Sequence, residues 1–196
     1  MAENEPIEPS SNTVFRLPRS HWHCHLGNFE WDKVTPQSLR SRVRQFVQDV
    51  NEGRAPHVLL TGTPGIGKSH IGVGVYRALV TTFGTQLVTW LNVPAFCERV
   101  KRTYGADDVD PWADIEDARR LIVLDDLFGR DLTAHERDQI LVRLIDTAYQ
   151  NNAGFFVTMN PSVQELQAKL LPHEISRLLA GSTIIPVVGQ KDYRVG

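Results

Sequence analysis

The sequence predicts an α/β fold in which a mostly parallel sheet of five strands lies between layers of helices. Three observations predict it. Short apolar runs alternate with longer segments of helical periodicity, which is the order of parallel strands joined by helices. The runs are continuously apolar, as in strands buried on both faces. A glycine-rich loop follows the first strand run and precedes a helix, as expected at the carboxyl edge of such a sheet.

In the first half of the chain, helices and strands are expected to alternate. We expect a helix to start at Thr35, with Pro36 in its first turn, where a missing N–H is tolerated. Apolar residues then recur at helical spacing: Leu39, Val43, Phe46, Val47 and Val50. The next elements expected are a strand over 57–61, a helix over 68–82, a strand over 86–91 and a short basic helix over 94–104.

The second half continues this alternation after an acidic stretch, 105–118, that we expect to be a loop. Strands are expected over 121–125, 154–158 and 183–188. Thr133 and Glu136 have capping-box spacing before a helix, as do Ser162 and Glu165. The helix after Ser162 is expected to be interrupted near Pro172. Pro186 in the last strand indicates a sheet edge, because proline cannot donate to a central ladder.

Composition is ordinary for a globular domain and excludes several classes. The chain has 196 residues, 41% hydrophobic and 22% charged, with a net charge of −2, so there is no global positive field for nucleic acid. Two cysteines are too few for a disulfide framework. No apolar run reaches about 18 residues, so we expect no membrane partner, and we expect a cytoplasmic location. We expect residues 1–25 to be a disordered or extended segment and residues 26–196 to form one folded domain.

Residues 62–69 read GTPGIGKS and fit the phosphate-loop pattern G-x-x-x-x-G-K-[ST]. The glycines let the backbone wrap around an anion with its N–H groups pointing inward, and the next helix presents its N-terminus to the same anion. Lys68 would reach the terminal phosphates of ATP, and the Ser69 hydroxyl would bind Mg²⁺. The expected cofactor-binding residues are Gly62, Thr63, Pro64, Gly65, Ile66, Gly67, Lys68, Ser69 and His70.

Polar residues end two later strands. Asp125 and Asp126 follow LIVL, at the edge where ligands bind in open α/β sheets. Asp125 would hold Mg²⁺, and Asp126 could polarise the attacking water, although an acidic turn after a core strand is the alternative. Asn160 follows GFFVTM and could orient the water or contact the γ-phosphate. Asn-Pro-Ser is equally good turn and helix-cap chemistry.

Five motifs in this order, GTPGIGKS, LIVLDD, VTMN, ISRLL and DYR, resemble those of AAA+ ATPases. The nearest branch holds bacterial helicase loaders of the DnaC type and transposition helpers of the IstB type, and the resemblance covers roughly residues 26–195. It implies ATP hydrolysis with Mg²⁺, with Lys68 and Ser69 as the Walker A pair and Asp125 as the Walker B acid. It also implies Asn160 as sensor 1, Arg177 as an arginine finger and Arg194 as the sensor 2 arginine.

The resemblance implies partners as well. An arginine finger implies a homo-oligomer in ATP, and the branch implies a replicative helicase or a transposase as the protein served. The helix over 94–104 occupies the region that lines a single-stranded DNA path in related initiators. The DNA-contacting residues implied there are Arg99, Lys101, Arg102 and Tyr104. Phe29 is expected to help frame the adenine.

The sequence departs from the fuller family pattern at three points. No helical lid follows the sensor 1 strand, only about 25 residues precede the core, and Asp126 stands where most relatives have the longer glutamate. Two other functions therefore stay open: a small phosphotransferase such as a nucleotide kinase, and a nucleotide-binding interaction module with little hydrolysis. The run His21–His25 (HWHCH) suggests a metal site, but extended backbone would point neighbouring side chains to opposite sides.

Overall fold

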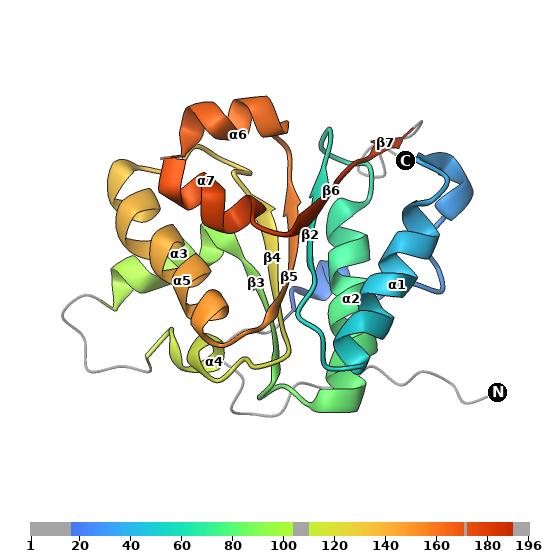
Figure 1. The fold of residues 1–196 in the computed structure, drawn as a ribbon, viewed down its shortest axis with the longest axis horizontal. Helices are drawn as coiled ribbons and strands as arrows, with labels where there is room; N and C mark the ends of the chain where they lie inside the picture. Colours follow the sequence, from blue (N-terminus) through green and yellow to red (C-terminus); the bar gives the residue numbers. More distant parts are fainter. Residues whose placement is uncertain (1–16, 104–109, 171, 190–196) are drawn as a thin grey trace.

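The centre of the structure is a five-stranded sheet with the strand order β3-β4-β5-β2-β6 (Figure 1). The structure is a computed structural model that describes residues 17–103, 110–170 and 172–189. Every neighbouring pair of these five strands is parallel, which confirms the predicted fold class. The strands are β2 (His57–Thr61), β3 (Val88–Asn92), β4 (Leu121–Leu127), β5 (Gly154–Met159) and β6 (Ser182–Pro186).

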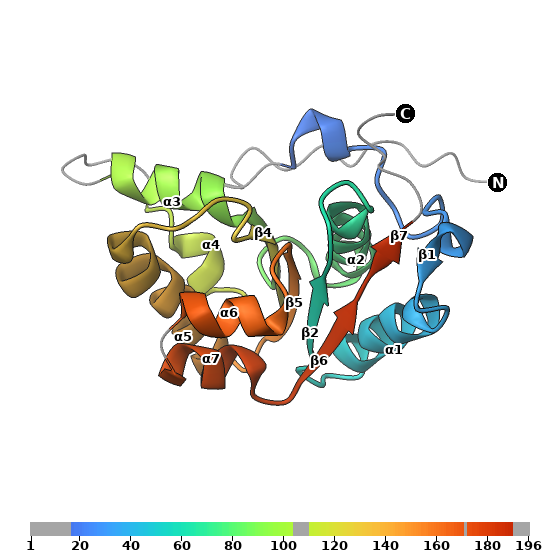
Figure 2. The same cartoon turned by 90° about the horizontal axis from the view of Figure 1, so that it is seen from above.

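Helices cover both faces of the sheet (Figure 2). One face carries α1 (Leu39–Asn51) and α2 (Lys68–Phe83). The other carries α3 (Val93–Arg102), α4 (Ala113–Glu116), α5 (Val142–Gln150), α6 (Val163–Lys169) and α7 (Pro172–Leu179). Two cores result, because successive residues of a strand point to opposite faces.

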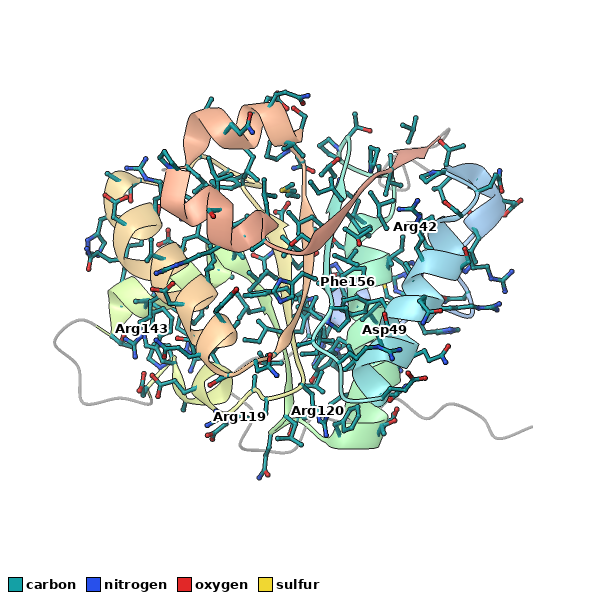
Figure 3. All side chains as sticks on the ribbon, in the orientation of Figure 1. Arg42, Asp49, Arg119, Arg120, Arg143 and Phe156 are labelled. Carbon is teal, nitrogen blue, oxygen red and sulfur yellow. The ribbon has the colours of Figure 1, made fainter. Side chains whose placement is uncertain are left out.

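Strand β5 shows how the sheet separates the two cores. Phe155 and Val157 belong to the core under α3 and α5, whereas Phe156 belongs to the core under α1 and α2. The Phe156 ring meets that of Phe46 edge to face, with centroids 5.1 Å apart, and lies in the interior of the molecule (Figure 3). This largely apolar strand is therefore buried on both sides, as its composition predicts.

Three expectations are wrong. The expected strand over 183–188 is divided, because β6 ends at Pro186 and Val188 belongs to β7 (Val188–Gly189) of a separate two-stranded sheet. The first helix starts at Leu39, because Val34–Thr35 form strand β1 and pair antiparallel with β7. The acidic stretch is not a loop throughout, since it contains α4. Its Trp112 and Ile115 are buried, and the Trp112 ring packs edge to face on Phe96 at 5.0 Å. These apolar side chains give the acidic segment a face that joins the core.

The two predicted capping boxes and the predicted sheet edge are confirmed. The Thr133 hydroxyl accepts from the Glu136 N–H at 3.2 Å, and the Glu136 carboxylate accepts from the Thr133 N–H at 2.9 Å. The following turns, Glu136–Leu141, are π-helical before α5 begins. Ser162 and Glu165 form a second reciprocal cap, and Pro186 lies on the edge strand β6.

Among the described residues, no helix is both long enough and apolar enough to cross a membrane.

Candidate nucleotide site

The glycine-rich loop between β2 and α2 adopts backbone conformations that require glycine. Gly62, Gly65 and Gly67 have φ values of 146°, 83° and 91°, in the region that side chains disfavour. A Cβ on Gly62 would lie 2.2 Å from the Val187 carbonyl oxygen, and one on Gly67 would lie 2.5 Å from the Phe29 ring. The loop is therefore both left-handed and tightly enclosed, as a phosphate cradle must be.

Lys68 lies at the start of α2 and bends over this loop. Its ammonium donates to the carbonyl oxygens of Gly62 and Thr63, at 2.7 Å each, and only 6% of the residue is exposed. Ile66 is buried beneath the loop. The charge is thus held within the cradle, where the N-terminus of a 16-residue helix adds its own positive end.

Two aspartates at the end of β4 are organised by one threonine of β5. Asp125 is 2% exposed and accepts a 2.7 Å hydrogen bond from the Thr158 hydroxyl. The same hydroxyl oxygen accepts from the Asp126 backbone N–H at 2.9 Å. Asp126 has a φ of 60°, and a Cβ on Gly129 would lie 2.0 Å from its carboxylate. Glycine at 129 therefore leaves room for this carboxylate beside the cavity.

These groups converge on one cavity of about 620 Å³, within the range of ligand pockets. The loop and α2 contribute Pro64, Gly65, Gly67, Lys68, Ser69 and His70, and the sheet edge contributes Asp126, Thr158 and Asn160. Thr158 was not among the predicted site residues, although a polar residue within the apolar run GFFVTM was a usable signal. The structure therefore brings the predicted phosphate loop, Asp126 and Asn160 together.

The N-terminal segment forms another wall of the same cavity. Phe29 is buried and meets the rings of Trp31 and His70 edge to face, at 4.7 and 5.3 Å. Ser20, His21, His23, Cys24, Asn28 and Glu30 also line the cavity. Sequence analysis proposed only Phe29 from this wall for the nucleotide. Partial burial lowers the pKa of His70, which keeps its ring neutral at pH 7.

Other predicted site residues lie elsewhere. Arg177 on α7 is exposed, is not among the residues lining the cavity, and forms an ion pair with Asp146 of α5. Arg194 and Tyr104 lie outside the described residues. On α3, Arg102 is exposed, whereas Lys101 contacts the carboxylates of Glu98 at 2.8 Å and Glu136 at 3.1 Å.

The donor set suits a magnesium ion. Ser69 places a hydroxyl at the cavity, and Asp125 is a buried carboxylate at the adjacent sheet edge. Mg²⁺ prefers oxygen ligands and usually takes few from the protein. Asp125 accepts one hydrogen bond from Thr158, and a carboxylate has further acceptor sites that a cation could use.

Several solved structures have a similar fold. No family model matches the sequence, and no curated protein matches it. The crystal structure of the DnaC helicase loader is similar with a TM-score of 0.71 and 19% identity, over 87% of this chain and 100% of that one. DnaI is similar with a TM-score of 0.71 and 18% identity, over 88% and 95% of the two chains.

A replication initiator is also similar. DnaA bound to AMPPCP and single-stranded DNA has a TM-score of 0.67 and 16% identity, over 87% of this chain and 51% of that one. Identities this low establish shared architecture and no more. The chain therefore has the same fold as the DnaC, DnaI and DnaA structures.

Proposed function

We propose that this protein binds and hydrolyses ATP with Mg²⁺ and acts as an ATP-dependent switch in DNA replication or transposition, as a helicase loader or transposase helper. One observation carries the proposal. The glycine cradle with Lys68, the carboxylate of Asp126 and the amide of Asn160 meet in one cavity, with Asp125 buried behind it. A phosphate loop alone would support nucleotide binding; the added polar groups supply the parts needed for phosphoryl transfer.

Each residue has a role that follows from its chemistry. Lys68 and the loop amides bind the β- and γ-phosphates, and Ser69 and Asp125 hold Mg²⁺, which would neutralise charge on the phosphates. Asp126 accepts a proton from, or polarises, a water in the cavity, and Asn160 orients that water. Phe29 offers an apolar ring to the base. Arg194 is proposed to contact the nucleotide as well.

The position of Arg177 supports action between subunits. Its side chain is exposed, and it pairs with Asp146 rather than facing the cavity of its own chain. We propose that it completes the site of a neighbouring copy, so that ATP favours a homo-oligomer. The surface pair with Asp146 costs little to break, because exposed ion pairs contribute about 0–1 kcal/mol.

The proposed partners follow from the similar structures and from α3. One similar protein is named a helicase loader and another is bound to single-stranded DNA. On this chain, α3 ends in the basic residues Arg99, Lys101 and Arg102, which could track a phosphate backbone, with Tyr104 available to stack on a base. We therefore propose a replicative helicase or transposase, and single-stranded DNA, as partners.

Lys68→Ala tests the nucleotide site. Losing a charge-assisted contact to phosphate costs about 1.5–3 kcal/mol, so ATP affinity in Mg²⁺ should fall about 10–100-fold, measured by calorimetry. Arg54→Ala is the control, since Arg54 is an exposed basic residue that pairs with Asp49 and Glu52, and none of the three is among the cavity-lining residues. Equal affinity in wild type and Lys68→Ala would refute the proposal.

A nucleotide-binding interaction module with little hydrolysis is the second candidate. The observation in its favour is Asp126, whose side chain is one methylene shorter than glutamate and whose backbone is held by Thr158. ATP binding without measurable phosphate release, with or without single-stranded DNA, would select this function over the first.

A further inference from the structure

Two histidines and a cysteine meet where the N-terminal segment crosses α2. His23 is exposed, Cys24 is buried and His70 is half-buried. One potential ligand atom from each lies within 4.8 Å of the others, and among the described residues no other such group of three or more occurs. The expectation of extended backbone over His21–His25 is wrong, because a 3₁₀ turn at Arg19–His21 continues into a turn at Trp22–His23.

The distances are close to those of a metal site. Zinc bond lengths of about 2.3 Å to sulfur and 2.0–2.1 Å to nitrogen place tetrahedral ligands roughly 3.5 Å apart. The Nε2 atom of His23 lies 3.7 Å from the Sγ atom of Cys24. The rings of His23 and His70 are edge to face, with centroids 6.0 Å apart. The three ligand atoms lie within 4.8 Å of one another, so shortening their separations by roughly 1.3 Å at most would bring them to bonding positions.

Asn28 fixes the tautomer of His70. The Asn28 amide nitrogen donates to the His23 carbonyl at 2.7 Å, and its Oδ1 atom accepts from the His25 N–H. This oxygen lies 2.8 Å from Nε2 of His70, and the His25 carbonyl oxygen lies 3.2 Å from the same nitrogen. Two acceptors face Nε2, so Nε2 carries the hydrogen and Nδ1 carries the lone pair. Metal-binding histidines are commonly oriented by such a contact on their other nitrogen.

The segment that carries His23 and Cys24 is held firmly against α2. Arg77 donates to the Trp22 carbonyl at 2.6 Å. A Cβ on Gly74 would lie 2.9 Å from the Leu26 nitrogen, so the glycine permits this close approach. Ligands from separate elements are thus held in place by contacts that do not involve the ligand atoms, as a preorganised site requires.

We propose that His23, Cys24 and His70 bind a thiophilic divalent transition metal, Zn²⁺ in the first instance, at the edge of the nucleotide cavity. One thiolate and two imidazoles form a donor set suited to zinc, and three protein ligands leave a fourth position for water. Burial raises the pKa of the Cys24 thiol to about 11, so forming the metal–sulfur bond releases the thiol proton to solvent. The bound metal links α2 to the N-terminal segment, which also carries Phe29.

The test is a Co²⁺ titration of the full chain, stripped of metal and kept reduced, without nucleotide. The expected result is one equivalent bound, with a thiolate-to-cobalt charge-transfer band, visible bands of tetrahedral cobalt, and displacement by Zn²⁺. Cys24→Ser should remove the charge-transfer band, and Cys97→Ser, which alters the other buried cysteine, should keep it. Absence of saturable binding, or a band that survives Cys24→Ser, overturns the proposal.

Further variants keep the test decisive if Cys24→Ser does not fold. His23→Ala changes an exposed side chain and should abolish tetrahedral binding, whereas His25→Ala, in the same segment, should retain it. Asn28→Ala should weaken affinity about 10–100-fold, the usual effect of losing a contact that orients a ligand. Equal binding by His23→Ala and wild type rejects the site. Lys68→Ala should leave cobalt binding intact, which separates this inference from the proposed nucleotide function.

Discussion

Thr158 joins the two carboxylate residues at the carboxyl edge of the sheet. Its hydroxyl donates to the Asp125 carboxylate and accepts from the Asp126 N–H, so one oxygen sets both the side chain of one aspartate and the backbone of the next. The residue is 1% exposed, and water cannot easily replace either bond. Thr158 is therefore a positioning residue for both proposed functions of the pair.

Thr158→Val should separate this role from simple packing. Valine keeps the shape but leaves the buried Asp125 carboxylate and the part-buried Asp126 N–H without their Thr158 partner, which costs about 1–3 kcal/mol in unfolding free energy. Mg²⁺-dependent ATP turnover should fall more than ATP binding does, because the aspartates lose their orientation. Urea unfolding and phosphate release measure the two effects. Thr81→Val on the surface of α2 is the control, and a turnover unchanged by Thr158→Val would contradict the role.

At the scale of elements, a buried carboxylate links the π-helical segment to its surroundings. Glu136 is fully buried and accepts from Arg130 at 2.6 and 2.9 Å. Lys101 of α3 lies 3.1 Å from the same carboxylate. Arg130, the Thr133 N–H and Lys101 hold the pKa of Glu136 far below its usual value of 4.5. A depressed pKa means that the folded state favours the charged form.

Glu136→Gln should change how the free energy of unfolding depends on pH. The stabilisation by the carboxylate is fully present above its unfolded pKa, near 4.5, and is lost as pH falls below that value. We expect the variant to be about 1–3 kcal/mol less stable than wild type at pH 7, with the difference shrinking from pH 5 to pH 3. Urea unfolding at each pH measures it. Glu116→Gln, in an exposed pair with Arg143, should change the free energy of unfolding little. A difference in stability between Glu136→Gln and wild type that does not vary with pH would contradict this prediction.

Among the basic residues of α3, Arg102 is the best one on which to test DNA binding, because Lys101 pairs with Glu136. Changing Lys101 would disturb Glu136 as well as any DNA contact, whereas Arg102 is exposed. If Arg102 neutralises one phosphate, Arg102→Ala should weaken single-stranded DNA binding and lower the slope of log K against log salt by about 0.7. Fluorescence anisotropy across a salt series measures this. Arg40→Ala on α1 is the control, and an unchanged slope would exclude the contact.

At the scale of the whole molecule, the cavity and Arg177 belong to different surfaces. The cavity lies at the carboxyl edge of the sheet, with α2 on one side, while Arg177 lies on α7 beside α5. Because Arg177 is not among the residues that line the cavity of its own chain, we propose that it acts on ATP bound to another copy. The proposed oligomer therefore needs its interface to bring α7 of one chain to the cavity of the next.

Arg177→Ala should uncouple binding from turnover. ATP affinity should stay near that of wild type, whereas the rise of specific activity with protein concentration should disappear, with a loss of up to about 10³–10⁵ in rate for an arginine finger. Steady-state assays over a range of protein concentrations measure it. Arg143→Ala, an exposed arginine of α5, is the matched control. Wild-type activity that is flat with concentration and equal to that of Arg177→Ala would refute the intersubunit role.

Contiguous patterns predicted most of the architecture. The strands of the sheet, the two capped helices and the edge position of Pro186 were predicted because each depends on neighbours in the chain. The start of α1 and the existence of α4 were not, since Val34–Thr35 pair with a strand more than 150 residues away and Trp112 packs on Phe96. Tertiary contacts outweighed local propensity at both places.

The sequence by itself determined the phosphate cradle, because GTPGIGKS contains its glycines, its lysine and its helix start in eight adjacent residues. Only the tertiary structure decided that Thr158 holds Asp125 and Asp126, that Glu136 holds Arg130 and Lys101, and that Cys24 and His70 meet. These contacts join separate elements, so they depend on strand register and on how segments pack across the sheet. No spacing along the chain encodes them.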